Sequence, residues 1–171
     1  HLLSRRQRQM CIRDRNILLK GFIKEIIEEM QPIAQKTNNT LEFIQQRDIR
    51  VYADRIQLKR VIKNLIQNAI SYGEPNFPIE VSIGEIPQYI VIKVKDYGAG
   101  ISKTDIDKIF NKYYSAAKKF RKIGTGLGLY LALQIIKSHN GELSVESEEG
   151  NFTEFTIKLP AVMNINLHYG E

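Results

Sequence analysis

Hydrophobic and polar positions follow a helical period in several stretches of the chain. The first apolar stripe starts near Ile17, and Pro32 is expected to end that helix because proline cannot continue the hydrogen-bond ladder. A second helix is predicted to begin at Asp54, which can form a capping box with Gln57. Another is predicted over residues 127–138, where the apolar stripe returns.

Segments with a period of two lie between these helices and predict strands. One more helix is expected after Ser102, with an apolar face formed by Ile106, Ile109, Phe110 and Tyr113. The alternation of the two kinds of element predicts an α/β fold. The expected strands are residues 41–45, 49–53, 79–83, 89–95, 142–146 and 152–159.

Length and composition are those of one soluble globular domain. The chain has 171 residues, of which 43% are hydrophobic and 26% are charged, and this is enough for a sizeable core. It contains no apolar run of the ~20 residues that a membrane-spanning helix needs. We therefore expect no membrane contact by this part of the protein.

The net charge of +6 is concentrated at the start of the chain. Residues 1–15 hold five arginines and one aspartate, which leaves only +2 for the remaining 156 residues. A basic surface of the kind that binds nucleic acid is therefore not expected. Residues 10–14 can be back-translated into one frame of a transposase sequencing adapter, so segment 1–15 is expected to be non-native, or else a disordered basic arm.

Cys11 is the only cysteine, which excludes an internal disulfide.

Two asparagines lie four residues apart on the helix that Asp54 is predicted to open. Asn64 and Asn68 share one face of that helix. Their neutral amide oxygens suit Mg²⁺, which keeps several waters and takes few protein ligands beside substrate phosphates. A solvated polar helix face is the structural alternative.

A carboxylate follows a predicted strand at Asp96, and Gly98 and Gly100 come after it. Asp96 can accept a hydrogen bond from the amino group of adenine, whereas guanine presents a carbonyl group at that position. The glycines allow the backbone to approach a base closely. This pattern favours ATP over GTP, with a plain Asp-Gly turn as the alternative.

Glycines recur in residues 124–128, which read Gly-Thr-Gly-Leu-Gly directly before a predicted helix. The N–H groups at a helix N-terminus form a site for phosphate. The stretch lacks both the Gly-Lys-Ser/Thr of a P-loop and the strand that precedes a dinucleotide-binding fingerprint, so neither class fits. Residues 115–123 are small and basic and are expected to form a mobile loop. Its Lys119 and Arg121 can reach a triphosphate, or else are solvated.

His139 lies at the end of the helix predicted over residues 127–138. An imidazole at a helix C-terminus complements the helix dipole. A structural role is therefore expected for His139, rather than a role as a phosphate acceptor.

Taken in order, these residues resemble the catalytic domain of histidine kinases, a branch of the GHKL ATPases, over roughly residues 17 to 160. The resemblance implies that Asn64 and Asn68 are catalytic and that Asn68 binds Mg²⁺. The motifs that carry it are residues 64–69 (N box), 96–100 (G1 box), 109–114 (F box), 115–123 (ATP lid) and 124–129 (G2 box). The ATP site that it implies is formed by Asn68, Tyr72, Asp96, Gly98, Gly100, Ile101, Tyr113, Lys119, Arg121, Gly124, Thr125, Gly126, Leu127, Gly128, Leu129 and Thr153.

The same resemblance implies a fold and an activity. The fold is a two-layer α/β sandwich, the Bergerat fold, in which a mixed sheet carries helices on one face. The activity is transfer of the γ-phosphoryl group of Mg-ATP to a histidine on a dimerisation hairpin, in a homodimeric sensor kinase that signals to a response regulator. The catalytic domain is expected over residues 16–160, in the cytoplasm whether or not the full-length protein is membrane-anchored. Residues 161–171 have no assignment.

Several features depart from the family pattern. Hydrolytic members such as gyrase have glutamate where this chain has Asn64; that glutamate activates water, so asparagine favours a transferase. Ser71 replaces a lysine or histidine found in many members, and Ile123 replaces a glycine. No histidine here has the setting of an acceptor, so the hairpin is expected upstream in a longer protein. A GHKL ATPase module and a nucleotide-binding domain without kinase activity are the alternatives.

Overall fold

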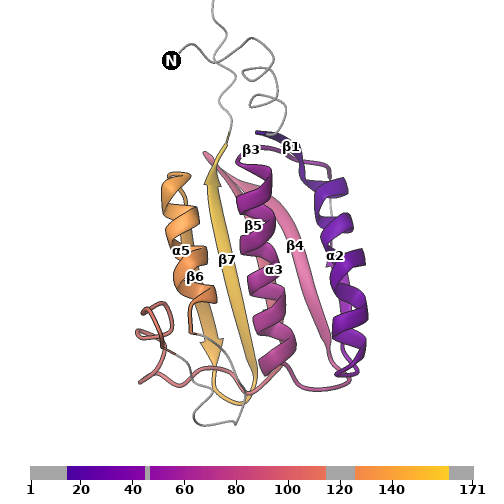
Figure 1. Ribbon diagram of the computed structural model, residues 1–171, viewed down its shortest axis with the longest axis vertical. Coiled ribbons are helices and arrows are strands. Elements are labelled where there is room, and N and C mark those ends of the chain that lie inside the picture. Colours follow the sequence, from indigo (N-terminus) through magenta and orange to yellow (C-terminus); the bar gives the residue numbers. More distant parts are fainter. Residues whose placement is uncertain (1–14, 45–46, 115–125, 162–171) are drawn as a thin grey trace, which may run out of the picture.

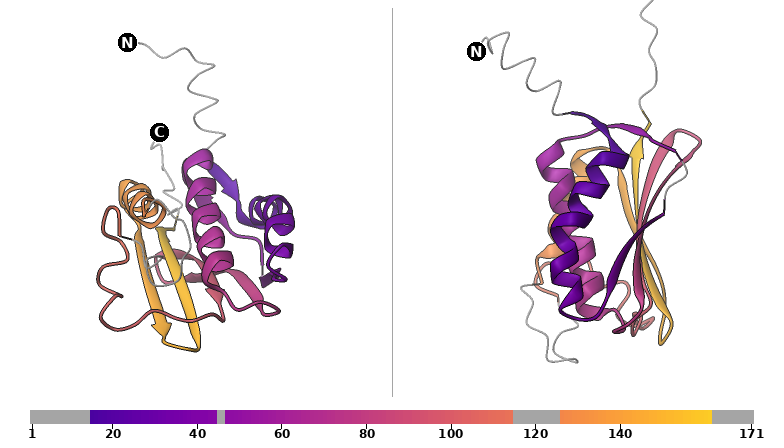
Figure 2. Two further views of the ribbon diagram at one scale, coloured as in Figure 1. Left: turned by 60° about the horizontal axis from the view of Figure 1, so that its bottom comes forward. Right: turned by 90° about the vertical axis from the view of Figure 1, so that its right-hand side faces the viewer.

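Two layers make up the part of the chain that the computed structural model describes, which is residues 15–44, 47–114 and 126–161. One layer is a twisted five-stranded sheet, and the other consists of helices that all cover the same face of it (Figures 1 and 2). The predicted two-layer α/β sandwich is thereby confirmed.

The sheet is mixed, with the strand order β2-β4-β5-β7-β6. β2 and β4 pair in parallel and every other neighbouring pair is antiparallel. A separate antiparallel pair, β1 with β3, lies at one end of the molecule. The strands are β1 (Asn16–Leu18), β2 (Thr40–Ile44), β3 (Arg50–Tyr52), β4 (Pro78–Ile86), β5 (Tyr89–Asp96), β6 (Glu142–Glu148) and β7 (Phe152–Pro160).

Each helix buries one apolar stripe against the sheet, as the helical period predicts. The helices are α2 (Leu19–Gln35), α3 (Arg55–Tyr72) and α5 (Gly128–Ser138). In α3 the buried side chains are Leu58, Val61, Ile62, Leu65, Ile66, Ala69 and Ile70. They meet alternate residues of the central strands, including Ile79, Val81, Ile92, Val94, Phe155 and Ile157.

The N-terminus of α3 is fixed by two side chains from different parts of the chain. The Asp54 carboxylate accepts a hydrogen bond from the Gln57 N–H at 2.9 Å, which is the predicted cap. His139, at the end of α5, accepts the Asp54 N–H on Nε2 at 3.0 Å. Its Nδ1 lies 2.8 Å from the Ile135 carbonyl oxygen, to which it donates. The expected structural role of His139 therefore includes joining the end of α5 to the start of α3.

Two local predictions were wrong. Pro32 lies inside α2 and does not end it; the helix continues for one more turn, in which Ala34 is fully buried. The Ala34 carbonyl oxygen accepts hydrogen bonds from both the N–H and the hydroxyl group of Thr37. The helix expected after Ser102 is also absent, because residues 103–110 form turns.

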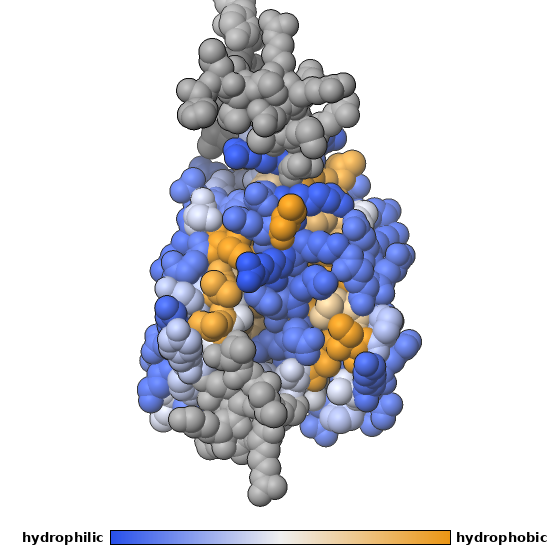
Figure 3. All heavy atoms as spheres, in the orientation of Figure 1, coloured by the Kyte–Doolittle hydropathy of each residue, from blue (hydrophilic) through white to orange (hydrophobic). Residues whose placement is uncertain are grey.

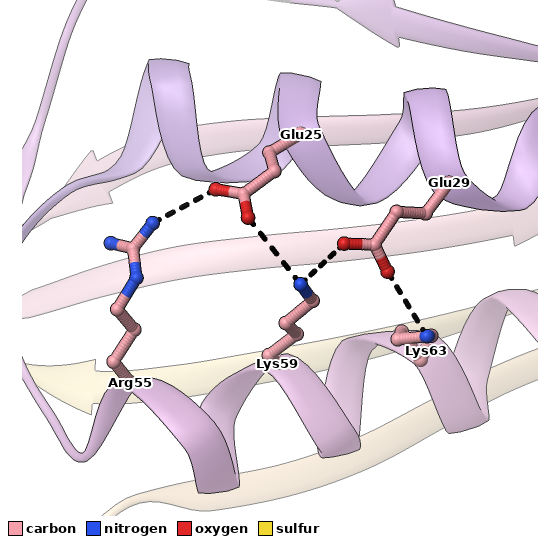
Figure 4. Close-up of polar contacts among 5 residues, drawn as sticks. All are labelled: Glu25, Glu29, Arg55, Lys59 and Lys63. Carbon is pink, nitrogen blue, oxygen red and sulfur yellow. Dashed lines mark hydrogen bonds and ion pairs between the residues drawn. The ribbon is translucent and has the colours of Figure 1, made fainter.

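A ladder of ion pairs crosses the outer side of α2 and α3 (Figure 4). Glu25 contacts Arg55 and Lys59, and Glu29 contacts Lys59 and Lys63, with nitrogen-to-oxygen distances of 2.5 to 3.4 Å. The lysine partners lower the pKa of Glu29 through hydrogen bonds. Because these groups are solvated, they contribute little to stability.

The helix face is hydrophilic, with apolar side chains in separate groups rather than one patch (Figure 3). Ile56 is the most exposed large hydrophobic residue in the described ranges, at 81%. No helix of the described residues has the length and apolar character that crossing a membrane requires.

Candidate functional site

Four elements end or begin at the same edge of the molecule, opposite β1 (Figure 1). β5 ends at Asp96 and α3 ends at Tyr72, while β7 begins at Phe152 and α5 begins at Gly128. The loop of residues 97–114 runs between them. Two adjoining cavities lie here, and together they contain most of the described residues of the predicted ATP site.

The inner cavity has a volume of about 100 Å³. Asp96 and Thr153 lie in its wall and are 2% and 5% exposed. They occupy directly paired positions on β5 and β7. The cavity is lined by Asn68, Tyr72, Asp96, Ala99, Gly100, Ile101, Ser102, Asp105, Ile109, Tyr114, Leu129, Glu149 and Thr153.

Burial changes the acid strength of the Asp96 carboxyl group. Loss of solvation raises the pKa of Asp96 from 3.8 to about 6, although a hydrogen bond from the Gly98 N–H at 3.0 Å partly opposes the shift. At neutral pH Asp96 is therefore mainly a buried carboxylate that bears on the cavity. Such a buried carboxylate forms its strongest hydrogen bond with a donor group on a ligand.

The outer cavity is larger, at about 350 Å³, and its lining is more polar than that of the inner cavity. It shares Asn68, Tyr72, Ile109, Tyr114 and Leu129 with the inner cavity. Its other lining residues are Asn64, Gln67, Ser71, Gly126 and Gly128.

The two cavities differ in the charge of the residues that line them. Asp96, Asp105 and Glu149 line the inner one, whereas no acidic side chain lines the outer one among the described residues. The outer cavity also meets the start of α5, where no side chain of the described residues caps Leu127 and no acid lies in the first turn. Helix N–H groups in this arrangement attract an anion. The inner cavity thus suits a donor-bearing ring, and the outer one suits phosphates.

The two asparagines have different surroundings. Asn64 donates through Nδ2 to the Gly128 carbonyl oxygen at 3.3 Å, which ties α3 to the beginning of α5. Asn68 lies one turn further along α3 and borders both cavities. The described residues contain no cluster of three or more His, Cys, Asp or Glu that can hold a metal. A Mg²⁺ ion that takes most of its ligands from phosphates and water fits a single amide oxygen such as that of Asn68.

The glycines after Asp96 approach protein backbone. A Cβ on Gly98 would lie 1.9 Å from the Tyr72 carbonyl oxygen, so only glycine lets this loop contact the end of α3. Gly100 has φ +68°, and a Cβ there would lie 2.2 Å from the Glu148 carbonyl oxygen. The expected close approach is present, but its partners are α3 and the β6–β7 turn; Gly100 also lines the inner cavity, and Gly98 does not.

Two adjacent tyrosines differ in placement. Tyr113, a predicted contact of ATP, is 69% exposed and lines neither cavity. Tyr114 lines both, and burial together with a hydrogen bond to Asp105 raises the pKa of its hydroxyl group. Sequence reasoning placed both in one motif but selected the first. The Tyr113 N–H instead donates to the Gly126 carbonyl oxygen at 3.1 Å.

The remaining predicted residues fall into two groups. Leu127 precedes α5 as its N-cap, and Ile101, Leu129 and Thr153 line the inner cavity. Segment 115–125 lies outside the described residues. Four predicted contacts of ATP belong to it: Lys119, Arg121, Gly124 and Thr125. Ile123, noted above as a departure from the family pattern, also belongs to this segment.

Two sensor proteins are similar to this chain in sequence. Sensor histidine kinase WalK of Bacillus subtilis (strain 168) is 34% identical over 150 residues, which are 84% of this chain and 24% of WalK. Sensor protein SrrB of Staphylococcus aureus is 34% identical over 149 residues, 78% of this chain and 26% of SrrB. The chain thus spans about a quarter of the length of these relatives.

A solved structure shares the fold. The nucleotide-free catalytic domain of histidine kinase ThkA superposes with a TM-score of 0.75 at 28% identity, covering 85% of this chain and 94% of that one. The model of the family described as histidine kinase-, DNA gyrase B- and HSP90-like ATPases matches residues 53–163, which include both cavities. Membership of this family implies that the domain binds ATP. On this match, the chain belongs to the histidine kinase-, DNA gyrase B- and HSP90-like ATPases.

Proposed function

We propose that this chain is the catalytic domain of a sensor histidine kinase, spanning residues 16–160. In this proposal the domain binds Mg-ATP and transfers its γ-phosphoryl group to a histidine on a dimerisation hairpin of the same protein. The relatives named above are sensor proteins, and their length leaves room for such a hairpin and for a sensor segment.

The main support for the proposal is that acidic side chains line the inner cavity but not the described part of the outer cavity. Adenine carries an amino group that donates hydrogen bonds, and the buried Asp96 carboxylate in the inner cavity accepts them. The triphosphate then extends into the outer cavity, toward the acid-free start of α5. Placing the nucleotide the other way round would bring its phosphates against three carboxylates, which is electrostatically unfavourable.

The outer cavity favours transfer over hydrolysis. Its described lining contains no carboxylate and no histidine, and therefore no general base that activates water. Asn64 occupies the position of the hydrolytic glutamate and donates to the Gly128 carbonyl oxygen. A glutamate could not make that bond, since its carboxylate only accepts. Catalysis then depends on positioning and on charge stabilisation.

Magnesium completes the proposed site. Asn68, at the junction of the cavities, supplies an amide oxygen to an ion that also binds the phosphates. The bound ion neutralises charge on the transferred group. The proposed partners are the histidine hairpin, a second copy of the full-length protein and a response regulator, all in the cytoplasm.

Radiolabelled ATP tests the proposal, first with the chain alone and then with its hairpin added in trans. The chain alone is expected to bind ATP with Mg²⁺, to hydrolyse it very slowly and not to label itself. With the hairpin, label should move to the hairpin histidine, weakly, because the two parts are not tethered. Brisk phosphate release without the hairpin would identify an ATPase instead.

The variant Asn68→Ala should abolish transfer by removing the Mg²⁺ ligand. Asn16→Ala is the matched control, because Asn16 is exposed on β1 at the opposite end of the molecule. Equal transfer by both variants would contradict the assignment of Asn68.

A further inference from the structure

Three polar side chains form a row across the sheet, and two of them line the inner cavity. Ser147 on β6 is directly paired with Thr153 on β7, and Thr153 is directly paired with Asp96 on β5. Directly opposed residues point to the same face of a sheet, and Asp96 and Thr153 line the cavity. Ser147 is the outermost of the three and belongs to none of the motifs described above.

The Ser147 hydroxyl group has three partners. Its oxygen accepts the Ile101 N–H at 2.8 Å. It donates to the Phe152 carbonyl oxygen at 2.7 Å. It also lies 2.9 Å from the Thr153 hydroxyl oxygen. These contacts attach the loop after Asp96 to the β6–β7 hairpin, beside the bond from the Gly150 N–H to the Ala99 carbonyl oxygen at 2.7 Å.

Hydrogen counting fixes the direction of the Ser147–Thr153 bond. A hydroxyl group carries a single hydrogen, and a carbonyl oxygen can only accept, so the Ser147 hydrogen is used by Phe152. The hydrogen between the two hydroxyl groups must therefore come from Thr153. Thr153 is left with lone pairs and no hydrogen for the cavity.

We infer that Ser147 is a positioning residue that sets the nucleotide specificity of the site by holding the Thr153 hydroxyl group as a hydrogen-bond acceptor. The inference rests on the proposed function. With Ser147 in place, Asp96 and Thr153 both present acceptors to the base. A purine with an amino group at position 6 offers a donor to these two acceptors, whereas one with an oxygen there places a third acceptor against them. Ser147 thereby strengthens the preference for 6-aminopurine nucleotides that the proposed function already implies.

Removal of the Ser147 hydroxyl group releases the Thr153 hydrogen. In Ser147→Ala the Thr153 hydroxyl can rotate and donate into the cavity, and a 6-oxo group then finds a donor. The ratio of the ITP to the ATP dissociation constant should fall by about fivefold, the effect of one neutral hydrogen bond. ITP is the suitable probe because it replaces the 6-amino group of ATP with an oxygen and adds one hydrogen at N1, but lacks the 2-amino group of GTP.

The experiment measures ATP and ITP binding to the full chain by calorimetry, with Mg²⁺ present. Ser147→Thr keeps a hydroxyl group and should restore the ratio. Ser144→Ala is the matched control, since Ser144 lies on the same strand but three positions away, on the opposite face of the sheet. It should leave both constants unchanged.

The outcomes separate this inference from the proposed function. If Ser147→Ala weakens ATP and ITP equally, Ser147 has only a structural role and the inference is wrong, whereas the ATP site stands. An unchanged ratio in a stably folded variant has the same meaning. If the unaltered chain binds neither nucleotide, the proposed function itself fails.

Discussion

Replacing Asp96 with asparagine should stabilise the nucleotide-free protein while weakening its affinity for ATP. Asparagine has nearly the same shape, and its amide oxygen can still accept the Gly98 N–H. What changes is the charge buried in the inner cavity. The substitution therefore separates the cost of that charge from the shape of the site.

The magnitude of the stabilisation follows from the pKa. Burial raises the pKa of Asp96 from 3.8 to about 6, so the native state holds its proton more tightly than the unfolded chain does. The stability associated with this proton is complete below pH 3.8 and is lost as the pH rises through 6. Above pH 6 the loss amounts to about 3 kcal/mol, which asparagine avoids. For a chain of this length we expect a melting temperature ~6–12 °C higher at pH 7.5.

The affinity for ATP changes in the opposite direction. The asparagine amide can present only an N–H donor or a weaker neutral acceptor to the adenine amino group. Loss of a hydrogen bond to a charged group costs about 1.5–3 kcal/mol, or roughly 10- to 150-fold in the dissociation constant.

Thermal melts and calorimetric titrations at pH 4.5 and pH 7.5 measure both effects. The stabilisation should be small at pH 4.5 and large at pH 7.5. Asp107→Asn serves as a control, because Asp107 is an exposed carboxylate in the turns of residues 103–110; it should change neither quantity. The reasoning is refuted if Asp96→Asn has the same melting temperature as the unaltered protein at pH 7.5, or binds ATP equally well.

Two further predictions concern stability, measured as the urea midpoint. His139→Ala should destabilise the protein by about 1–2 kcal/mol, because the Asp54 N–H loses its acceptor and the link between α5 and α3 is broken; an unchanged midpoint would show that the link contributes nothing. Gly98→Ala should cost about 1–3 kcal/mol or more, since its Cβ meets the Tyr72 carbonyl oxygen. In Gly84→Ala no atom lies within 4 Å of the new Cβ, so a comparable loss there would contradict the steric explanation.

Local signals in the sequence predicted the parts of the fold that depend on neighbouring residues. The cap of α3 is an example, because Asp54 and Gln57 are three positions apart and need no other element. The pattern around Asp96 likewise placed a carboxylate at the end of a strand, and the structure has it there.

Errors arose where packing between distant elements decides the outcome. Pro32 removes one backbone donor near the end of α2, but burial of Ala34 and the bonds from Thr37 hold the last turn. The stretch after Ser102 borders a cavity, with Ile109 as its only fully buried side chain. It lacks the continuous apolar surface that an amphipathic helix needs, and it forms turns. Ser147 gave no sequence signal, since its contacts depend on strand register.

The bond between the Tyr113 N–H and the Gly126 carbonyl oxygen has a consequence for how such a domain can diversify. It brings the residues on either side of segment 115–125 together, and the tight approach of Gly126 to the Tyr113–Tyr114 backbone fixes them there. A segment inserted between two joined positions can change length at little entropic expense, since closure depends only logarithmically on chain length. The corresponding segments from other members of the family should therefore be exchangeable as units at this junction, without changes to the sheet, the helices or the inner cavity.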